Sequence, residues 1–396
     1  MVIHLITRLP MGGATQLVYD ITQRMHNSGQ NVCIFTGLSD EQRSSSAKNN
    51  RILENVRAAG IPVEVCPYLQ NRISPLNDLR ALLWITRRLW KRKPGIVHIH
   101  SSKAGILGRL ACKLAGIQRV IFHVHGWPFS RPGGVVRRVY LALEHAFYRL
   151  TTEYIFVSRQ DILDFIQLGG NPNIESKSHV IYPGADFLSP ENGQVHRQNL
   201  RRQLGLGDGD HVVGSIGRLD YQKNPQIFVT IAQEYAKIDP TAYFIWIGEG
   251  DEREEVEKLI NALNLSDRFM LPGYVEDVEP YYHIFDTFAL TSRHEGLPLA
   301  VIKALASGTP VVEFLSNGMV DLNAQFRSVF GAPPGDVKQF VKQLGNARLM
   351  LIEQSDVLEE EAQYVRENLN RDRMYEEIMA VYASSPGSII LPSTGT

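Results

Sequence analysis

Two cations and a predicted helix start form the strongest group of chemically active residues in the sequence. Arg218 and Lys223 lie in a loop between an apolar run at 211–216 and a helical pattern that begins at Asn224-Pro225. The free amides and the dipole of a helix N-terminus attract anions, and both side chains add positive charge. The spacing therefore predicts a diphosphate site, and the alternative is two ordinary surface cations.

A second loop places a carboxylate beside another predicted helix start. The apolar run 287–291 predicts a strand, residues 293–296 form a polar turn, Pro298 suits a first helical turn, and Gly308-Thr-Pro310 ends that helix. In an open parallel sheet such a turn lies at the carboxyl ends of the strands, where ligands bind. Glu295 in this turn is suited to the hydroxyl groups of a sugar.

The elements around these loops alternate between strands and helices, which predicts parallel sheets with helices on both faces. A chain of 396 residues is long enough for two such domains. The expected parts are an N-terminal lobe (1–188), a polar linker (189–198), a C-terminal lobe (199–365), and a flexible tail (385–396). The final helix is expected at about 358–383, with residues 366–384 packing back on the N-terminal lobe.

Composition excludes several classes of protein. Forty-one basic against forty-two acidic residues give no charge bias of the kind that nucleic-acid binders show, so no nucleic-acid partner is expected. Cys33, Cys66 and Cys112 are odd in number and lie in apolar runs, which favours buried reduced thiols. Neither a signal peptide nor a membrane span is expected, and these features favour the cytoplasm. We expect the sorting-signal-like string at 391–395 to be a tail or an appended tag.

The string Glu295-Gly-Leu-Pro-Leu-Ala-Val-Ile, followed by Ala-Leu-Ala-Ser-Gly-Thr-Pro-Val-Val, resembles the donor-site signature of the family-4 retaining glycosyltransferases. These enzymes have the GT-B architecture, in which two Rossmann-like lobes face each other across a cleft. The resemblance covers about residues 1–380. It implies that Glu295 faces the donor sugar together with Gly296 and Leu297, and that Arg218 and Lys223 stabilise the leaving nucleotide diphosphate.

One position departs from the family pattern. The family places a second Glu, which holds the ribose of the nucleotide, eight positions after the first, and this chain has Lys303 there. Lysine only donates hydrogen bonds, so it cannot accept them from ribose hydroxyls. Lys303 is therefore kept as a substrate-binding residue, with weakened or lost activity as the consequence to test.

Glycine-rich strand exits are the remaining nucleotide-site candidates. Gly12 and Gly13 follow the first strand, and by resemblance they face the donor phosphates and the acceptor; the alternative is a tight turn without a ligand. Gly248 and Gly250 follow the strand at 243–247 and are expected to line the nucleotide site, and the backbone at Val275 is expected to pass the base. The dinucleotide-binding fingerprint is absent, which disfavours an oxidoreductase.

Two His-x-His pairs, at 98/100 and 123/125, lie near the ends of consecutive predicted strands, so four imidazoles could converge on a metal. No acidic or cysteine ligand accompanies them, and the resembled family works without a metal, so we expect none. By resemblance to the family's His-Gly turn, His125 is the catalytic candidate of the N-terminal lobe. Lys103 is a candidate for an acceptor phosphate.

Two predicted helices, at 76–93 and 131–149, mix large apolar residues with arginine and lysine. This basic amphipathic pattern suits an anionic membrane surface, and the alternative is ordinary solvated helix faces.

Together these observations predict a retaining, metal-independent hexosyltransferase without a cofactor. The co-substrate would be a nucleotide diphosphate sugar, with UDP favoured. The acceptor would be a saccharide, expected to be lipid-linked, at the cytoplasmic face of a membrane. The alternatives are a non-catalytic nucleotide-sugar-binding partner subunit, suggested by Lys303, and a nucleotide-sugar epimerase of the same architecture. The catalytic candidates are His125, Arg218, Lys223 and Glu295.

Overall fold

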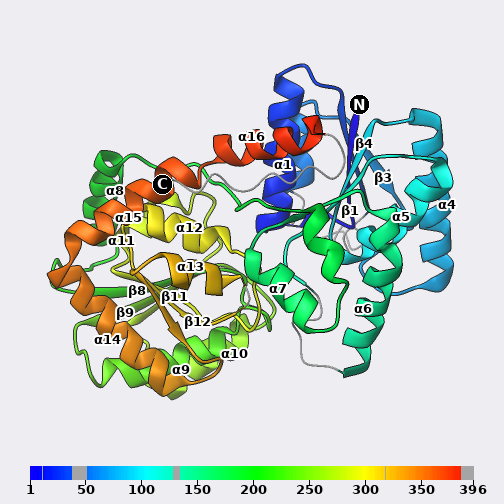
Figure 1. The fold of residues 1–396 in the computed structure, drawn as a ribbon. Helices are drawn as coiled ribbons and strands as arrows, with labels where there is room; N and C mark the ends of the chain where they lie inside the picture. Colours follow the sequence, from blue (N-terminus) through cyan, green and yellow to red (C-terminus); the bar gives the residue numbers. More distant parts are fainter. Residues whose placement is uncertain (11, 38–50, 128–133, 317, 385–396) are drawn as a thin grey trace. The chain divides into compact units, whose positions relative to one another are not determined.

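The structure, a computed structural model, forms two α/β units (Figure 1). It describes residues 1–10, 12–37, 51–127, 134–316 and 318–384. Unit 1 is Met1–Tyr182 with the chain from Met374 onward, and unit 2 is Pro183–Arg373. Each unit contains one parallel sheet covered by helices, which confirms the predicted fold class. The first residues of the helix predicted at 131–149 and the string at 391–395 lie outside the described residues.

The sheet of unit 1 has seven parallel strands in the order β3-β2-β1-β4-β5-β6-β7. Most of its residues are buried, as expected for a sheet that is covered on both faces. The strands are β1 (Val2–Ile6), β2 (Val32–Gly37), β3 (Val63–Cys66), β4 (Ile96–His100), β5 (Val120–Val124), β6 (Glu153–Phe156) and β7 (Ser178–Val180).

Helices cover both faces of this sheet (Figure 1). One face carries α4 (Pro75–Arg92), α5 (Ser102–Ala115), α6 (Gly134–Phe147) and α7 (Arg159–Gln167), with short 3-10 turns at Tyr148–Leu150 and Pro172–Lys177. The other face carries α1 (Gly13–Asn27), α3 (Arg51–Ala58) and α16 (Arg371–Ala383).

Helix α16 completes the core of unit 1 from the far end of the chain. Met374, Ile378 and Val381 are buried in one cluster with Leu17 and Ile21 of α1. The first lobe of the sequence therefore depends on its last helix for one of its apolar clusters.

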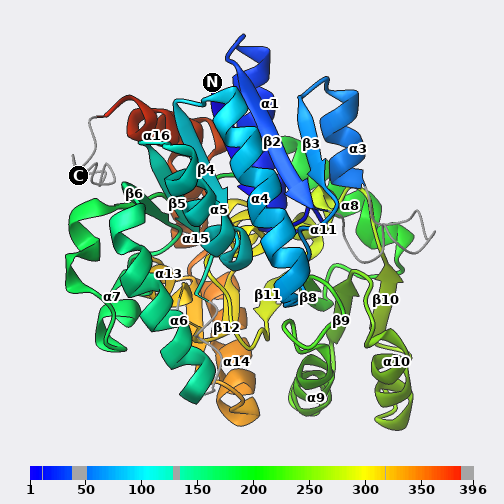
Figure 2. The same ribbon diagram turned by 90° about the vertical axis from the view of Figure 1, so that its right-hand side faces the viewer.

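The sheet of unit 2 has six parallel strands in the order β10-β9-β8-β11-β12-β13. They are β8 (His211–Ile216), β9 (Ala242–Ile247), β10 (Phe269–Gly273), β11 (Thr287–Leu290), β12 (Val311–Phe314) and β13 (Val329–Ala332). Helices α9 (Pro225–Ala236), α10 (Arg253–Ala262) and α14 (Val337–Glu353) pack on one face (Figure 2). The other helices of the unit are α8 (Pro190–Gln203), α11 (Glu279–Ile284), α12 (Leu299–Ala306), α13 (Met319–Gln325) and α15 (Ser355–Asn368).

Two expectations about chain organisation differ from the structure. The polar segment 189–198, expected as a linker, forms most of α8, which ion pairs through Arg197 and Arg201 with Asp286. The final helix is two helices, because Asn370 pairs with the backbone of Ala185 and ends α15 before α16 begins.

The three cysteines are buried and unpaired, as predicted. Among the described residues, no helix is both long and apolar enough to cross a membrane.

Candidate functional site

Two loops at the carboxyl ends of neighbouring strands carry the main predicted residues of unit 2. The β8 loop (217–224) joins β8 to α9, and the β11 loop (291–298) joins β11 to α12. Because β8 and β11 pair in parallel, both loops leave the same edge of the sheet. This arrangement brings Lys223 and Glu295 together although 72 residues separate them.

Hydrogen bonds join the two loops directly. The backbone N–H of Arg293 donates to the carbonyl of Gln222 (2.8 Å), and the Gln222 side chain donates to the carbonyl of His294 (3.1 Å). The Thr291 hydroxyl donates to the carbonyl of Lys223 (3.1 Å). The Arg293 guanidinium donates to Oδ1 of Asn224 (2.8 Å), the residue that caps α9. The two loops therefore behave as one structural element.

The charged groups of these loops form two opposite-charge pairs. Lys223 Nζ lies 2.6 Å from Glu295 Oε1, and their side chains are only 16% and 9% exposed. Arg218 Nη2 lies 2.9 Å from Asp220 Oδ2, and the Arg218 side chain is 54% exposed. The sequence predicted that Arg218, Lys223 and the start of α9 direct positive charge at one spot, and the structure adds the negative charges of Asp220 and Glu295 beside those cations. The diphosphate site itself stays a prediction. A diphosphate would have to compete with these two carboxylates for the cations.

The glycines after β9 allow the β8 loop to pack closely. A Cβ atom on Gly248 would lie 2.0 Å from the carbonyl oxygen of Gly217, and one on Gly250 would lie 2.2 Å from that of Leu219. Both positions therefore require glycine for loop packing alone. Their predicted contact with a nucleotide stays a prediction.

The remaining unit 2 candidates lie around the same edge. A Cβ atom on Gly318 would lie 1.7 Å from the carbonyl oxygen of Gly296, so the β11 loop is also closely covered. Leu297 is buried, and Val275 is half-buried in the segment after β10. The structure gives neither residue a polar side-chain role.

Lys303 is paired with a carboxylate that sequence reasoning missed. Its Nζ atom contacts Glu279 Oε2 at the start of α11, and it lies 5.9 Å from the ring centroid of Tyr282. Burial raises the pKa of the Glu279 carboxyl, and Lys303 opposes that shift. No local sequence signal could reveal the pair, since 24 residues separate its members.

In unit 1, the candidates after β1 and β4 differ in what they contact. Gly12 and Gly13 are exposed, with Gly13 as the first residue of α1. Lys103 lies at the start of α5, where its Nζ atom is 2.6 Å from Asp78 Oδ1 and also contacts the carbonyl of Arg72. Because Lys103 already has a carboxylate partner, an acceptor phosphate would share the ammonium with Asp78.

The structure brings the four predicted imidazoles together and adds a fifth, His4 of β1, which sequence reasoning did not include. His4 pairs with His98 in the β1–β4 register, and His100 pairs with His123 in the β4–β5 register. His125 follows β5, and its Nε2 atom lies 3.0 Å from Nδ1 of His100. Burial lowers the pKa of His125 to about 4, so its ring is neutral at pH 7. The following residue adopts a φ of 114°, which favours the glycine found there.

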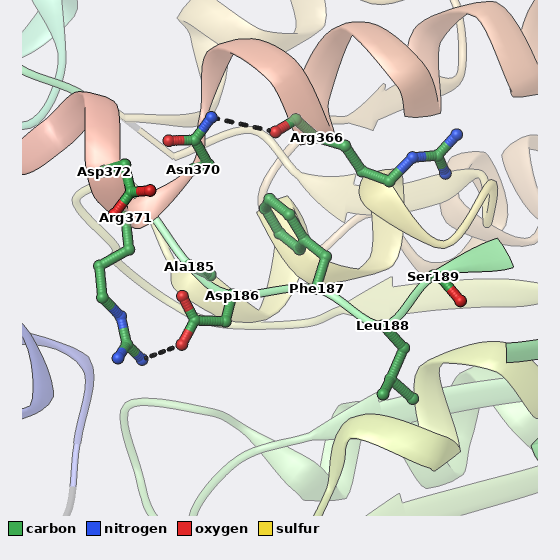
Figure 3. A pocket seen from close by; sticks show the side chains of 9 residues that line it. All are labelled: Ala185, Asp186, Phe187, Leu188, Ser189, Arg366, Asn370, Arg371 and Asp372. Carbon is green, nitrogen blue, oxygen red and sulfur yellow. Dashed lines mark hydrogen bonds and ion pairs between the residues drawn. The ribbon is translucent and has the colours of Figure 1, made fainter. Parts of the chain in front are cut away.

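The pocket of about 370 Å³ shown in Figure 3 lies away from these candidates. It is formed by unit 2 residues 185–189, 366 and 370–372. Its edge is held by an ion pair between Arg371 and Asp186 (3.0 Å) and by a hydrogen bond from the Asn370 side chain to the carbonyl of Arg366 (3.2 Å). None of the predicted site residues lines it. Its ion pair joins the segment 185–189 to the start of α16.

Comparison with known families divides the chain at nearly the same place as the fold. The family described as "Glycosyl transferase 4-like domain" matches residues 12–184, and "Glycosyl transferases group 1" matches residues 196–364.

Individual proteins are similar over most of the chain. One match is the UDP-Gal:alpha-D-GlcNAc-diphosphoundecaprenol alpha-1,3-galactosyltransferase of Escherichia coli, to which the chain is 33% identical over 271 residues. The match covers 67% of this chain and 68% of that protein. It is 31% identical over 345 residues to the 2-deoxystreptamine N-acetyl-D-glucosaminyltransferase of Niallia circulans, with 83% and 86% covered. The crystal structure of Anabaena HepE in complex with UDP matches with a TM-score of 0.78 at 20% identity, over 97% of this chain and all of that one.

Proposed function

The chain belongs to the glycosyltransferases with a 4-like and a group 1 domain, and we propose that it transfers a sugar from UDP to a lipid-linked saccharide. The transferred group would be a hexose or an N-acetylhexosamine, and its anomeric configuration would be retained. The reaction would need no metal and no cofactor other than the nucleotide sugar, as the family resemblance implies. The name of the E. coli relative supports both the uridine donor and the diphosphate-linked acceptor.

The observation that carries the proposal is the contact of Lys223 with Glu295 at the edge of the unit 2 sheet. Lys223 lies next to the start of α9, and Glu295 lies just before α12. A departing diphosphate would be stabilised by Lys223, by Arg218 and by the N-terminus of α9, which are placed before the charge develops. The Glu295 carboxylate would accept hydrogen bonds from the donor sugar's hydroxyls.

We assign no residue as a covalent nucleophile. In the proposed route the acceptor hydroxyl attacks the anomeric carbon from the face that the diphosphate leaves. The C–O bond to the acceptor forms as the C–O bond to the diphosphate breaks, and the departing phosphate oxygen takes the hydroxyl proton. The protein's contribution is charge stabilisation and positioning.

The outer face of α4 supports a peripheral contact with an anionic membrane. Leu76, Leu79, Leu83 and Trp90 are each more than half exposed, and they follow one another at helical spacing. These four residues form the apolar stripe of α4. Arginine and lysine residues of the same helix flank it. An exposed apolar stripe with basic flanks is the pattern of helices that lie on anionic lipid surfaces. Val135 and Val139 of α6 are also exposed, and we propose the cytoplasmic membrane surface as the site of action.

A second candidate function is a nucleotide-sugar-binding partner subunit without activity of its own. The observation that favours it is Lys303, which occupies the position of the family's second carboxylate and is engaged by Glu279.

A transfer assay separates these functions. UDP-galactose, UDP-glucose and UDP-N-acetylglucosamine would each be incubated with GlcNAc-diphosphoundecaprenol, with and without EDTA, and the products analysed by mass spectrometry and anomeric NMR. We expect a retained glycosidic product, unaffected by EDTA and lost in Arg218→Ala but not in Lys258→Ala, an exposed cation of α10. Donor binding without product would support the partner subunit, and an altered nucleotide sugar without acceptor would indicate an epimerase.

A further inference from the structure

A hydrogen-bonded chain runs through the sheet of unit 1 from the last helix to His125. The His98 Nδ1 atom lies 2.6 Å from the Tyr382 hydroxyl of α16, and that hydroxyl lies 3.4 Å from His4 Nε2. His4 Nδ1 lies 3.1 Å from His100 Nε2, and His100 Nδ1 lies 3.0 Å from His125 Nε2. The links come from β1, β4, the end of β5 and α16, so only the folded unit assembles them.

This hydrogen-bonded chain constrains which ring nitrogen of each histidine carries the proton. A neutral imidazole has one N–H donor and one bare nitrogen acceptor, so fixing one link fixes the next. Tyr382 can donate only one proton, either to His98 across 2.6 Å or to His4 across 3.4 Å. A phenol donates strongly at the shorter distance and weakly at the longer one. Either choice leaves Nε2 of His98 without a described partner, so the two distances decide to which histidine the Tyr382 hydroxyl donates.

The remaining protons follow from that choice. With its proton directed to His98, the Tyr382 oxygen accepts from Nε2–H of His4, and Nδ1 of His4 is then bare. That nitrogen accepts from Nε2–H of His100, whose bare Nδ1 accepts from Nε2–H of His125. The last nitrogen of this hydrogen-bonded chain is therefore Nδ1 of His125, a half-buried residue, and it carries no proton.

We propose that Tyr382 is a positioning residue that, through His4 and His100, holds His125 in the Nε2–H tautomer and so presents its Nδ1 atom as a fixed hydrogen-bond acceptor. If the proposed transfer is correct, this nitrogen would accept from a sugar or acceptor hydroxyl. Nδ1 of His125 would then bind a hydroxyl group as a hydrogen-bond acceptor and would not donate a hydrogen bond to a phosphate.

Burial is consistent with a neutral chain. It lowers the pKa of His4 to about 3 and the pKa of His98 and His100 well below the usual range. It raises the pKa of the Tyr382 hydroxyl well above its ordinary value. Each link therefore has the protonation state that the chain requires at pH 7.

A metal is the competing occupant of this cluster. His4, His98 and His100 bring ring nitrogens within 4.8 Å of one another, as do His100, His123 and His125. Both triads consist of neutral ligands, without a carboxylate to offset the charge of a buried cation. In each triad two of the three rings are also already hydrogen-bonded to each other, His4 to His100 at 3.1 Å and His100 to His125 at 3.0 Å, whereas Nε2 of His98 and both ring nitrogens of His123 have no described partner. These two facts favour the proton-ordered chain.

Nitrogen-15 NMR of the full-length protein labelled at histidine tests the proposal without any substrate, so its outcome is independent of the transfer assay. Two-bond correlations show which nitrogen of each ring carries the proton, and single-histidine variants assign the signals. We expect His4, His100 and His125 to share the Nε2–H tautomer. Tyr382→Phe should convert His125 to a mixture of tautomers.

A second variant tests the direction of the chain. In His98→Phe the Tyr382 hydroxyl loses its near acceptor and must donate to His4, so His125 should switch to the Nδ1–H tautomer. The matched control is Tyr375→Phe, which removes another hydroxyl of α16, one bonded to Gln30 outside the chain, and should change nothing. Thermal unfolding confirms that each variant is folded.

Three results would overturn the proposal. They are an Nδ1–H tautomer at His125 in the unmodified protein, an Nε2–H tautomer that persists in both Tyr382→Phe and His98→Phe, and stoichiometric zinc, copper or nickel in the purified protein by elemental analysis.

Discussion

Lys223 Nζ lies 2.6 Å from Glu295 Oε1, and this ion pair links the charged groups of the two loops on which the proposed chemistry depends. The ammonium occupies one oxygen of the carboxylate and leaves other lone pairs for ligand hydroxyls. The same pair therefore fixes the cation for a diphosphate and the acceptor for a sugar. Its two members should behave as one unit when they are mutated.

A double-mutant cycle tests whether Lys223 and Glu295 act together. Lys223→Met and Glu295→Gln should each lower kcat/KM by about 10²–10³-fold, since each removes a preorganised charge. The double variant should be little worse than the poorer single variant, because groups that act together are not additive. Initial-rate kinetics measure this. The exposed Lys237–Glu234 pair, also 2.6 Å apart, is the control and should leave the rate unchanged. Fully additive losses would show that the residues act separately.

A charge swap tests the pair between α11 and α12. Lys303→Glu would place two carboxylates in contact at the position of Glu279, and we expect the free energy of unfolding to fall by about 1–3 kcal/mol. Adding Glu279→Lys should restore most of that loss, because it re-forms the pair in the opposite sense. Urea unfolding measures both variants. A double variant as unstable as Lys303→Glu would contradict the importance of the pair.

The buried carboxyl of Glu313 predicts a pH-dependent stability. Glu313 lies on β12 without exposed surface, and neither oxygen has a described hydrogen-bond partner. Burial raises its pKa well above 4.5. The folded protein then keeps a proton that the unfolded chain releases above about pH 4.5. The associated stability is fully present below that pH and is lost as the pH rises toward the folded pKa, at about 1.4 kcal/mol per pH unit.

Glu313→Gln should remove this dependence. The variant should gain stability over the unmodified protein at mildly alkaline pH and lose the gain at acidic pH, as measured by urea unfolding across the range. The exposed Glu254→Gln is the control. Parallel stability curves for Glu313→Gln and the unmodified protein would mean that the carboxyl is ionised in the fold.

The apolar stripe of α4 predicts membrane binding. Leu83→Ser with Trp90→Ser should weaken partition onto phosphatidylglycerol vesicles by about tenfold or more, because burying either side chain is worth about 1.5–3 kcal/mol. Leu349→Ser with Ile352→Ser removes two equally exposed apolar residues from α14 in unit 2 and should have no effect. Flotation assays compare the two. Equal weakening by both pairs would point to nonspecific adsorption.

The fold was predictable because its signals are local. Strand and helix alternate at a regular pace, which predicts parallel sheets with loops at one edge, and the family resemblance then assigned Lys223 and Glu295 to a common donor site. The parallel pairing of β8 with β11 then brings these two side chains into contact.

The charge balance of the site was not predictable, because it depends on side-chain direction. Asp220 lies two residues from Arg218, yet only the loop conformation turns it onto the guanidinium. Glu279, His4 and Tyr382 reach their partners across 24, 96 and 284 residues, and no spacing rule connects such positions. The break at Asn370 also arises from a tertiary contact, with Ala185, which overrides a helical pattern.

The return of α16 to unit 1 has a consequence for how the chain folds as it is made. Unit 2 is one continuous stretch, so all of its residues have been synthesised when Arg373 is added. Unit 1 begins first but lacks Met374, Ile378 and Val381 until all of unit 2 has been synthesised. Domains generally fold in the order of synthesis, but here the apolar face of α1 in the N-terminal unit stays uncovered until α16, which follows unit 2 in the chain, has emerged.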